Sequence, residues 1–114
     1  MTLLNYTVLT ACVVAIAAGQ IMFKMTARTA ATSGELRDLL LSPTLAIALL
    51  IYGAATLGWV WQLRSVDLTR AYPLMALSFV IVPLASMALL GEPVSLRYWA
   101  GVGLIIVGIL LTVL

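Results

Sequence analysis

The chain has 114 residues, of which 64% are hydrophobic and only 9% are charged. In soluble domains about a quarter of the residues are charged, so this composition excludes an ordinary soluble domain and indicates an integral membrane protein. Its six basic and four acidic residues are scattered, and the net charge of +2 suggests neither a nucleic-acid partner nor a polybasic lipid anchor.

Cysteine and histidine usage limits the chemistry. Cys12 is the only cysteine, so no intrachain disulfide can form, and the chain has no histidine for a His-containing metal or catalytic site. The N-terminal residues 1–6 lack the basic region of a signal peptide, so we expect the first apolar segment to be retained as a membrane span. We expect neither a cofactor nor enzymatic activity.

Charged residues divide the sequence into four apolar stretches, each close to the ~20 residues that cross a bilayer as a helix. They cover residues 3–23, 43–63, 71–90 and 95–114. Because they are continuously apolar and do not alternate, helices are favoured over a β-barrel. We predict an all-α membrane protein with a single domain, residues 1–114, and both termini on one side of the membrane.

The connections between the spans carry most of the charge. In the first, SGELRDLLLSP predicts a short interfacial helix over residues 34–41 that is capped by Ser33, and a solvated linker is the open alternative. The other ionisable residues lie in turns, where we expect the local ion pairs Asp67 with Arg70 and Glu92 with Arg97. We expect Trp59, Trp61, Tyr98 and Trp99 to lie in the interfacial aromatic belt.

Lysine and arginine counts bear on orientation. One side of the membrane carries four of these residues and the other carries two: Lys24, Arg28, Arg37 and Arg97 against Arg64 and Arg70. This bias favours placing both termini outside the cytoplasm. So small a bias is also what a protein that inserts in both orientations would show.

The first span ends in AAGQIMFK, where Gln20 and Lys24 share a stripe one helical turn apart. An ammonium at the bilayer centre costs about 2.5–3.5 kcal/mol, and less near the end of a span. Lys24 therefore either anchors the helix end or meets an anionic headgroup. Since no Asp or Glu lies within any span, we expect a substrate phosphate, and not a protein carboxylate, as the counter-ion of a functional Lys24.

The last two spans hold the other polar and small positions. Tyr72 opens the third span, and Ser78 supplies a hydroxyl further in. Pro83 lies inside this span and must remove a backbone hydrogen bond, so we predict a kink or hinge there. Gly101 and Gly108 lie two turns apart on one face of the last span, where another helix can approach closely. Because four helices cannot easily enclose a polar path alone, we expect a dimer.

Several short motifs occur in a specific order. They are AGQ followed by Lys24, then AYP at 71–73, SFV at 78–80, GEPVS at 91–95, RYW at 97–99 and GVGLIIVG at 101–108. Their order and spacing resemble the four-helix EamA-like proteins of the drug/metabolite transporter superfamily, including the small subunits of the aminoarabinose undecaprenyl-phosphate flippase. More distantly, the chain resembles the small multidrug resistance exporters, which form antiparallel dimers, and this resemblance implies an antiparallel dimer for the four-helix chain.

The resemblance implies a flippase subunit of the bacterial inner membrane that moves a polyprenyl-phosphate-linked sugar, as a homodimer or with a similar four-helix subunit. It implies that Lys24 and Gln20 contact the phosphate and that Tyr72 and Ser78 contact the sugar. Further candidates for capturing the phosphate at the interface are Arg70 and Arg97.

Two alternatives stay open: export of small cationic or polar compounds, and a non-transporting partner subunit. The small multidrug resistance exporters carry a glutamate where this chain has Ile16, and a tryptophan where it has Met75. Proton-coupled cation export needs an intramembrane carboxylate, so these departures disfavour drug/proton antiport.

Overall fold

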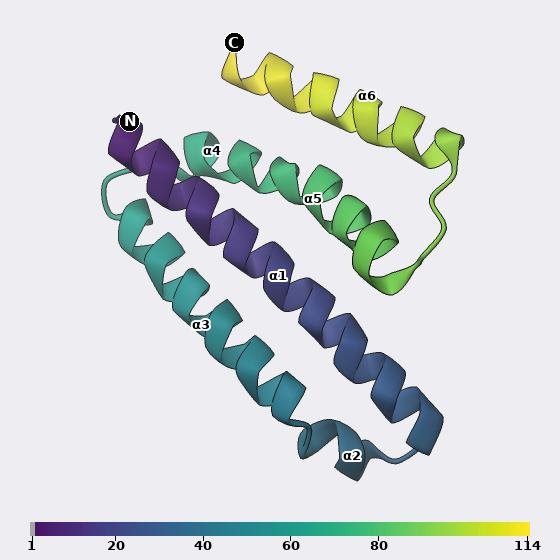
Figure 1. Ribbon diagram of the computed structural model, residues 1–114. Helices are drawn as coiled ribbons and strands as arrows, with labels where there is room; N and C mark the ends of the chain where they lie inside the picture. The colour runs from purple at the N-terminus through teal and green to yellow at the C-terminus, as the bar shows by residue number, and fades with distance from the viewer. Residues whose placement is uncertain (1) are drawn as a thin grey trace.

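In the computed structural model, which describes residues 2–114, the chain forms four long helical segments, and no strand occurs in that range (Figure 1). The segments are α1 (Leu3–Ser33), α3 (Pro43–Leu63), a composite third segment (Leu68–Leu90) and α6 (Leu96–Val113). The first three are long and apolar enough to cross a membrane, and α6 is a shorter apolar helix. The predicted all-α, four-helix membrane architecture is confirmed.

Helix α1 continues well beyond the end of its apolar run at Phe23. It begins after Thr2, whose hydroxyl accepts a hydrogen bond from the backbone three residues later. It ends at Gly34, which has a φ of 73° and donates its N–H to the Ala30 carbonyl at 2.8 Å. Ser33 therefore closes α1 and does not cap the short helix that follows, α2 (Leu36–Leu40), which lies within the predicted interfacial segment.

The third segment is helical but irregular. It consists of α4 (Leu68–Ala71), the 3₁₀ helix η1 (Tyr72–Leu77), α5 (Ser78–Ala85) and the π-helix η2 (Ser86–Leu90). Pro73 lies in the first turn of η1 and Pro83 lies inside α5, and each lacks a backbone N–H to donate. The backbone hydrogen-bond pattern changes from α to π just after Pro83, as expected for an interrupted helix. A role of Pro83 as a hinge stays a prediction.

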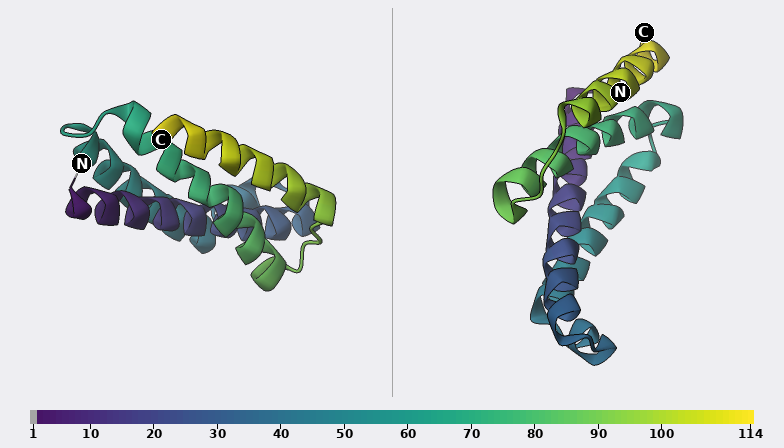
Figure 2. Two further views of the ribbon diagram at one scale, coloured as in Figure 1. Left: turned by 90° about the horizontal axis from the view of Figure 1, so that it is seen from above. Right: turned by 90° about the vertical axis from the view of Figure 1, so that its right-hand side faces the viewer.

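Helix α1 lies at the centre of the molecule and packs mainly against α3, with further contacts to η1 and α5 (Figures 1 and 2). Glycines make the close contact with α3 possible: a Cβ on Gly19 would lie 3.2 Å from Tyr52, and one on Gly58 would lie 3.0 Å from the Cys12 sulfur. Trp59 belongs to the buried core beside Cys12 and is only 8% exposed, so its predicted place in the aromatic belt is wrong.

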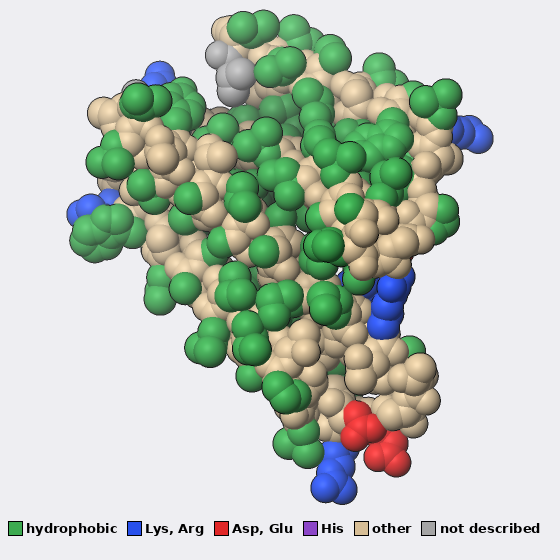
Figure 3. Space-filling model, in the orientation of Figure 1, with side chains coloured by type: hydrophobic (Ala, Val, Ile, Leu, Met, Phe, Trp, Pro, Cys, Tyr) green, Lys and Arg blue, Asp and Glu red, His purple; other side chains and the backbone are tan. Residues whose placement is uncertain are grey.

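Helix α6 is the least embedded of the long helices and packs against η1. A Cβ added at Gly101 or Gly108 would meet no atom within 4 Å, so the face predicted to pack against another helix is open. The two termini lie at the same end of the molecule as the turn between α3 and α4 (Figure 1). Figure 3 shows hydrophobic side chains over the body of one face and charged side chains at its periphery, as a membrane span requires.

The contact between α1 and α3 predicts a large difference between two glycines of α3. Gly58→Val should lower the free energy of unfolding in detergent micelles by about 1–3 kcal/mol, because its side chain would overlap Cys12. Gly53→Val is the matched control, since a Cβ there meets nothing within 4 Å. Cys12→Ala should recover part of the loss in the Gly58→Val background. Equal destabilisation by the two glycine substitutions would contradict this packing.

Candidate functional site

All four long helical segments contribute to a cavity of about 460 Å³, here called the tyrosine cavity. It is lined by Gln20 of α1, by Tyr52 of α3, by Tyr72 and Ser78 of the third segment, and by Tyr98 of α6. The predicted site residues Gln20, Tyr72 and Ser78 are thus brought together. Sequence reasoning missed Tyr52 and assigned Tyr98 to the aromatic belt alone.

The polar groups of the tyrosine cavity suit recognition of a hydroxylated ligand. Ser78 donates its hydroxyl to the Met75 carbonyl at 2.6 Å and keeps its oxygen lone pairs as acceptors. Tyr72 is 62% exposed, and Gln20 is also exposed. Tyr52 is held by its neighbour Phe23, with ring centroids 5.6 Å apart. Phenol, amide and hydroxyl groups can therefore all donate or accept here, between apolar walls.

An apolar groove of about 1000 Å³ adjoins the tyrosine cavity between η1 and α6. The two cavities share wall residues, namely Tyr72, Met75, Ser78 and Phe79. The groove reaches Ile109 and Thr112 near the end of α6. A ligand with a polar head in the tyrosine cavity can therefore lay an apolar portion along the groove.

A second polar cavity, of about 600 Å³, lies beside the turn between η2 and α6 and is here called the Glu92 cavity. Its polar lining comes from Ser86, Glu92, Ser95 and Tyr98. It shares Val82, Pro83 and Tyr98 with the tyrosine cavity, so the two are neighbours along the third segment.

The Glu92 carboxylate lies between two cations of α1. Its Oε1 is 3.7 Å from Lys24 Nζ and 3.6 Å from Arg28 Nη2. Its Oε2 accepts a much shorter hydrogen bond, 2.6 Å, from the hydroxyl of Ser86, which is 7% exposed. Ser86 therefore holds the carboxylate, and the two cations approach it more loosely.

Two sequence-based expectations are corrected by this cluster. Lys24 does have an acidic partner in the protein, and Glu92 pairs with Lys24 and Arg28, not with Arg97. The reason is the turn at Gly91, whose φ of 67° folds the chain back so that the Glu92 N–H donates to the Ser86 carbonyl at 3.3 Å.

Arg28 was not among the predicted site residues because the first span was taken to end at Phe23. In the continuous helix α1, Gln20, Lys24 and Arg28 follow each other at intervals of four residues and lie on one stripe. This spacing is visible in the sequence, and it would have identified Arg28 had the helix been extended.

The charge of Glu92 is fixed by its surroundings. The hydrogen bond from Ser86 is the largest influence on the pKa of the Glu92 carboxyl and lowers it. Loss of hydration, the next largest, raises this pKa, and the positive charges of Lys24 and Arg28 lower it, so that the pKa lies below its usual value. Glu92 is therefore ionised throughout the neutral pH range.

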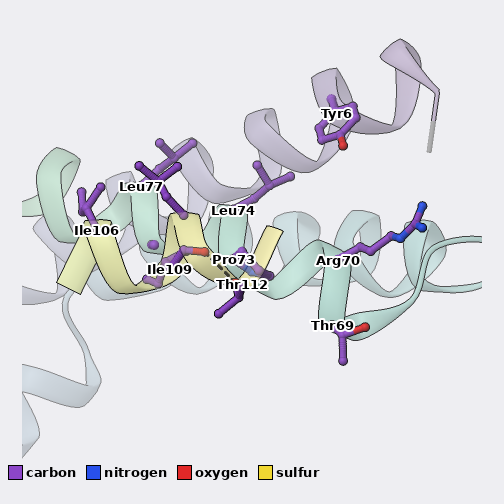
Figure 4. Close-up of a pocket in the computed structure, with 11 residues that line it drawn as sticks. Tyr6, Thr69, Arg70, Pro73, Leu74, Leu77, Ile106, Ile109 and Thr112 are labelled. Carbon is purple, nitrogen blue, oxygen red and sulfur yellow. Dashed lines mark hydrogen bonds between the residues drawn. The ribbon is translucent and has the colours of Figure 1, made fainter. Parts of the chain in front are cut away.

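Arg70 lies at the other end of the molecule, on a cavity of about 690 Å³ (Figure 4). Figure 4 shows its side chain extending away from the apolar side chains of Leu77 and Ile106. Tyr6 of α1 also lines this cavity and is about 27 Å from Lys24 along the helix, at 1.5 Å per residue. Arg70 and Lys24 therefore cannot bind the same phosphate group at the same time.

The structure also differs from two further expectations, the ion pair between Asp67 and Arg70 and a place for Arg97 at the binding site. Arg70 donates its backbone N–H to the Asp67 carbonyl at 3.0 Å, and within residues 2–114 their side chains form no ion pair. Arg97 is exposed at the start of α6 and lines none of the cavities described above.

The lowered pKa of Glu92 predicts how stability changes with acid. A carboxyl whose pKa is depressed on folding stabilises the fold above its unfolded pKa of about 4.3, and this contribution is lost as the pH falls through the native pKa. The difference in melting temperature between the wild type and Glu92→Gln in micelles should stay constant from about pH 5.5 to about pH 8 and shrink progressively as the pH falls below about 4.3. A difference that changes between pH values of about 6 and 8 would contradict this assignment.

Comparison with known proteins places the chain in a family. The sequence matches the EamA-like transporter family over residues 1–114. It is 44% identical, over 82% of each chain, to the probable 4-amino-4-deoxy-L-arabinose-phosphoundecaprenol flippase subunit ArnE of Sodalis glossinidius. Proteins of the same name from Klebsiella pneumoniae (40% identical, 82% of each chain) and Escherichia coli (42% identical, 82% of this chain and 83% of the other) are also similar. No solved structure matches the chain. The resemblance carried by its motifs is confirmed, and the chain belongs to the EamA-like transporter family.

Proposed function

We propose that the chain is a subunit of an inner-membrane flippase that moves a polyprenyl-phosphate-linked amino sugar across the bilayer. The observation that carries the proposal is that three sites of different chemistry adjoin: an apolar groove, the tyrosine cavity, and the Glu92 cavity with its two cations. A substrate of this kind has an apolar chain joined to a sugar through a phosphate. The groove suits the chain, the cations suit the phosphate, and the tyrosine cavity suits the sugar as it crosses.

Lys24 and Arg28 are suited to hold the phosphate at the membrane surface. Both side chains are about half exposed, at 52% and 46%, so a headgroup can reach them. A guanidinium and an ammonium one helical turn apart can donate to two phosphate oxygens together. If this end faces the cytoplasm, as the arginine and lysine bias favours, the substrate starts here.

The tyrosine cavity then offers a path for the sugar toward Arg70 at the far end. Gln20, Tyr72 and Ser78 line it, so sugar hydroxyls exchange water for protein hydrogen bonds as they cross. The prenyl chain stays in the apolar groove or the surrounding lipid.

The walls of the tyrosine cavity argue against a drug/proton antiporter. Ile16 and Met75, which stand where the small multidrug resistance exporters carry a glutamate and a tryptophan, both line it. The cavity thus lacks, at these two positions, the carboxylate and the indole that a proton-exchanged aromatic cation would need.

A charge exchange tests whether Lys24 binds the substrate or only holds Glu92. Lys24→Gln should slow the flipping of polyprenyl-phosphate sugar in proteoliposomes by about tenfold or more, since a hydrogen bond to a charged group is worth about 1.5–3 kcal/mol. The double variant Lys24→Glu with Glu92→Lys keeps an ion pair and should stay inactive, because the phosphate then meets a carboxylate on α1. The readout is the accessibility of the labelled lipid on each face.

The control for these variants is Arg37→Gln, which removes an exposed cation of α2 and should leave flipping unchanged. Full activity of the exchanged pair would assign Lys24 a purely structural role. Unchanged flipping in Lys24→Gln, with normal expression and assembly, would remove Lys24 from transport altogether.

The open face of α6 supports assembly with a second four-helix subunit, identical or similar, in either relative orientation. Gly101→Leu and Gly108→Leu should abolish crosslinking between subunits in membranes, because a bulky side chain prevents close helix approach. Gly103→Leu is the matched control: it is equally uncrowded in the single chain but lies on another face of α6. Loss of dimer in all three variants, or in none, would contradict an interface through Gly101 and Gly108.

A further inference from the structure

The binding of a phosphate to Lys24 and Arg28 gives no role to the carboxylate of Glu92, which lines the neighbouring cavity. Its carboxylate is held from one side by the 2.6 Å bond from Ser86 and by the backbone contact to the Ser86 carbonyl. The contacts to Lys24 and Arg28, at 3.7 and 3.6 Å, exceed the usual length of about 2.7–2.9 Å for a charge-assisted hydrogen bond. The carboxylate is thus fixed in place by Ser86, and its cationic partners are exchangeable.

Competition for donors defines what must replace those partners. When a phosphate diester binds Lys24 and Arg28, it takes the two cationic donors that approach Glu92 in the empty protein. The carboxylate, whose side chain is 35% exposed, then keeps the hydrogen bond from Ser86 on Oε2 and loses its charged partners at Oε1. An ammonium on the same ligand supplies charged donors to that oxygen, and such donors bind a carboxylate more strongly than a neutral hydroxyl does.

We infer that the Glu92 cavity is the subsite for the amino group of the sugar, with the Glu92 carboxylate as its acceptor and Ser86 as the residue that positions the carboxylate. This inference rests on the proposed function and names the part of the substrate that decides specificity. An ammonium has three donors for the carboxylate and the neighbouring Ser95, and Tyr98, which lines both polar cavities, is an aromatic residue of the kind that attracts cations.

The dimensions of the site agree with this assignment. A cavity of about 600 Å³ lies within the range of small-molecule pockets and holds a pentose-sized group with room for water. Since Glu92 contacts both Lys24 and Arg28, a phosphate on these cations lies one sugar ring or less from the carboxylate. One zwitterionic headgroup can therefore meet both sites at once.

The test compares two lipids in proteoliposomes that contain the assembled dimer: a polyprenyl-phosphate aminopentose and the same lipid with a hydroxyl in place of the amine. The wild type should flip the amino lipid about 10–100 times faster, since a site built for a polar group rejects a ligand that leaves that site unpaired. Glu92→Gln should lower this preference to below about threefold, mainly by slowing the amino lipid. Glu35→Gln, an exposed carboxylate in the loop before α2, should keep the wild-type preference.

Each outcome bears on a separate claim. If Glu92→Gln slows both lipids by the same factor, Glu92 only maintains the cation pair and the inference is overturned. Equal flipping of both lipids by the wild type overturns the inference while the proposed function stands, and no flipping of either lipid overturns the proposed function itself. Should Glu92→Gln fail to fold, Ser86→Ala carries the test: it should reduce the preference by loosening the carboxylate, and an unchanged preference would overturn the inference.

Discussion

The exclusion of unpaired charge from hydrocarbon is the constraint on which this structure depends. Of the charged side chains, Lys24, Arg28 and Glu92 gather where α1 meets the end of the third segment, and Arg70 lies at the opposite end. Between the two ends the polar groups are neutral phenols, hydroxyls and one amide. Under the proposed function, a charged headgroup has charged partners at both ends of the molecule and only neutral hydrogen-bonding groups between them, which favours passage over tight binding midway.

The difference in packing between the helices complements this arrangement. Gly19 and Gly58 allow α1 and α3 to lie close together, and these two helices make the most extensive contact between long helices in the described residues. The third segment and α6 are held by fewer neighbours and carry the proline-interrupted turns. Polar residues of both groups meet in the tyrosine cavity. A transporter that opens alternately to two sides needs such a division between a firm scaffold and looser walls.

The sequence allowed the four-helix membrane architecture to be predicted, because apolar runs of ~20 residues leave few alternatives. Gln20, Tyr72 and Ser78, which the family resemblance implied as substrate contacts, line one cavity, and their contact with a substrate stays a prediction. The ion cluster was not predicted, because its members come from different segments and the apolar run ends before the helix does. Closeness in sequence favoured Arg97 as the partner of Glu92. The left-handed turn at Gly91 instead directs the Glu92 side chain to α1. Trp59 was misplaced because composition alone cannot tell a lipid-facing indole from one packed beside Cys12.

The 3₁₀ helix at Tyr72–Leu77 makes the third segment longer than an α-helix of the same residues would be. A 3₁₀ helix rises about 2.0 Å per residue and an α-helix about 1.5 Å, so converting these six residues to α would shorten the segment by about 3 Å. The far end, with Ser86 and Glu92, would be drawn by that amount toward Arg70. Such a contraction would move Glu92 along the stripe of α1, away from Arg28 and toward Lys24, coupling backbone geometry in one half of the bilayer to charge pairing at the opposite surface.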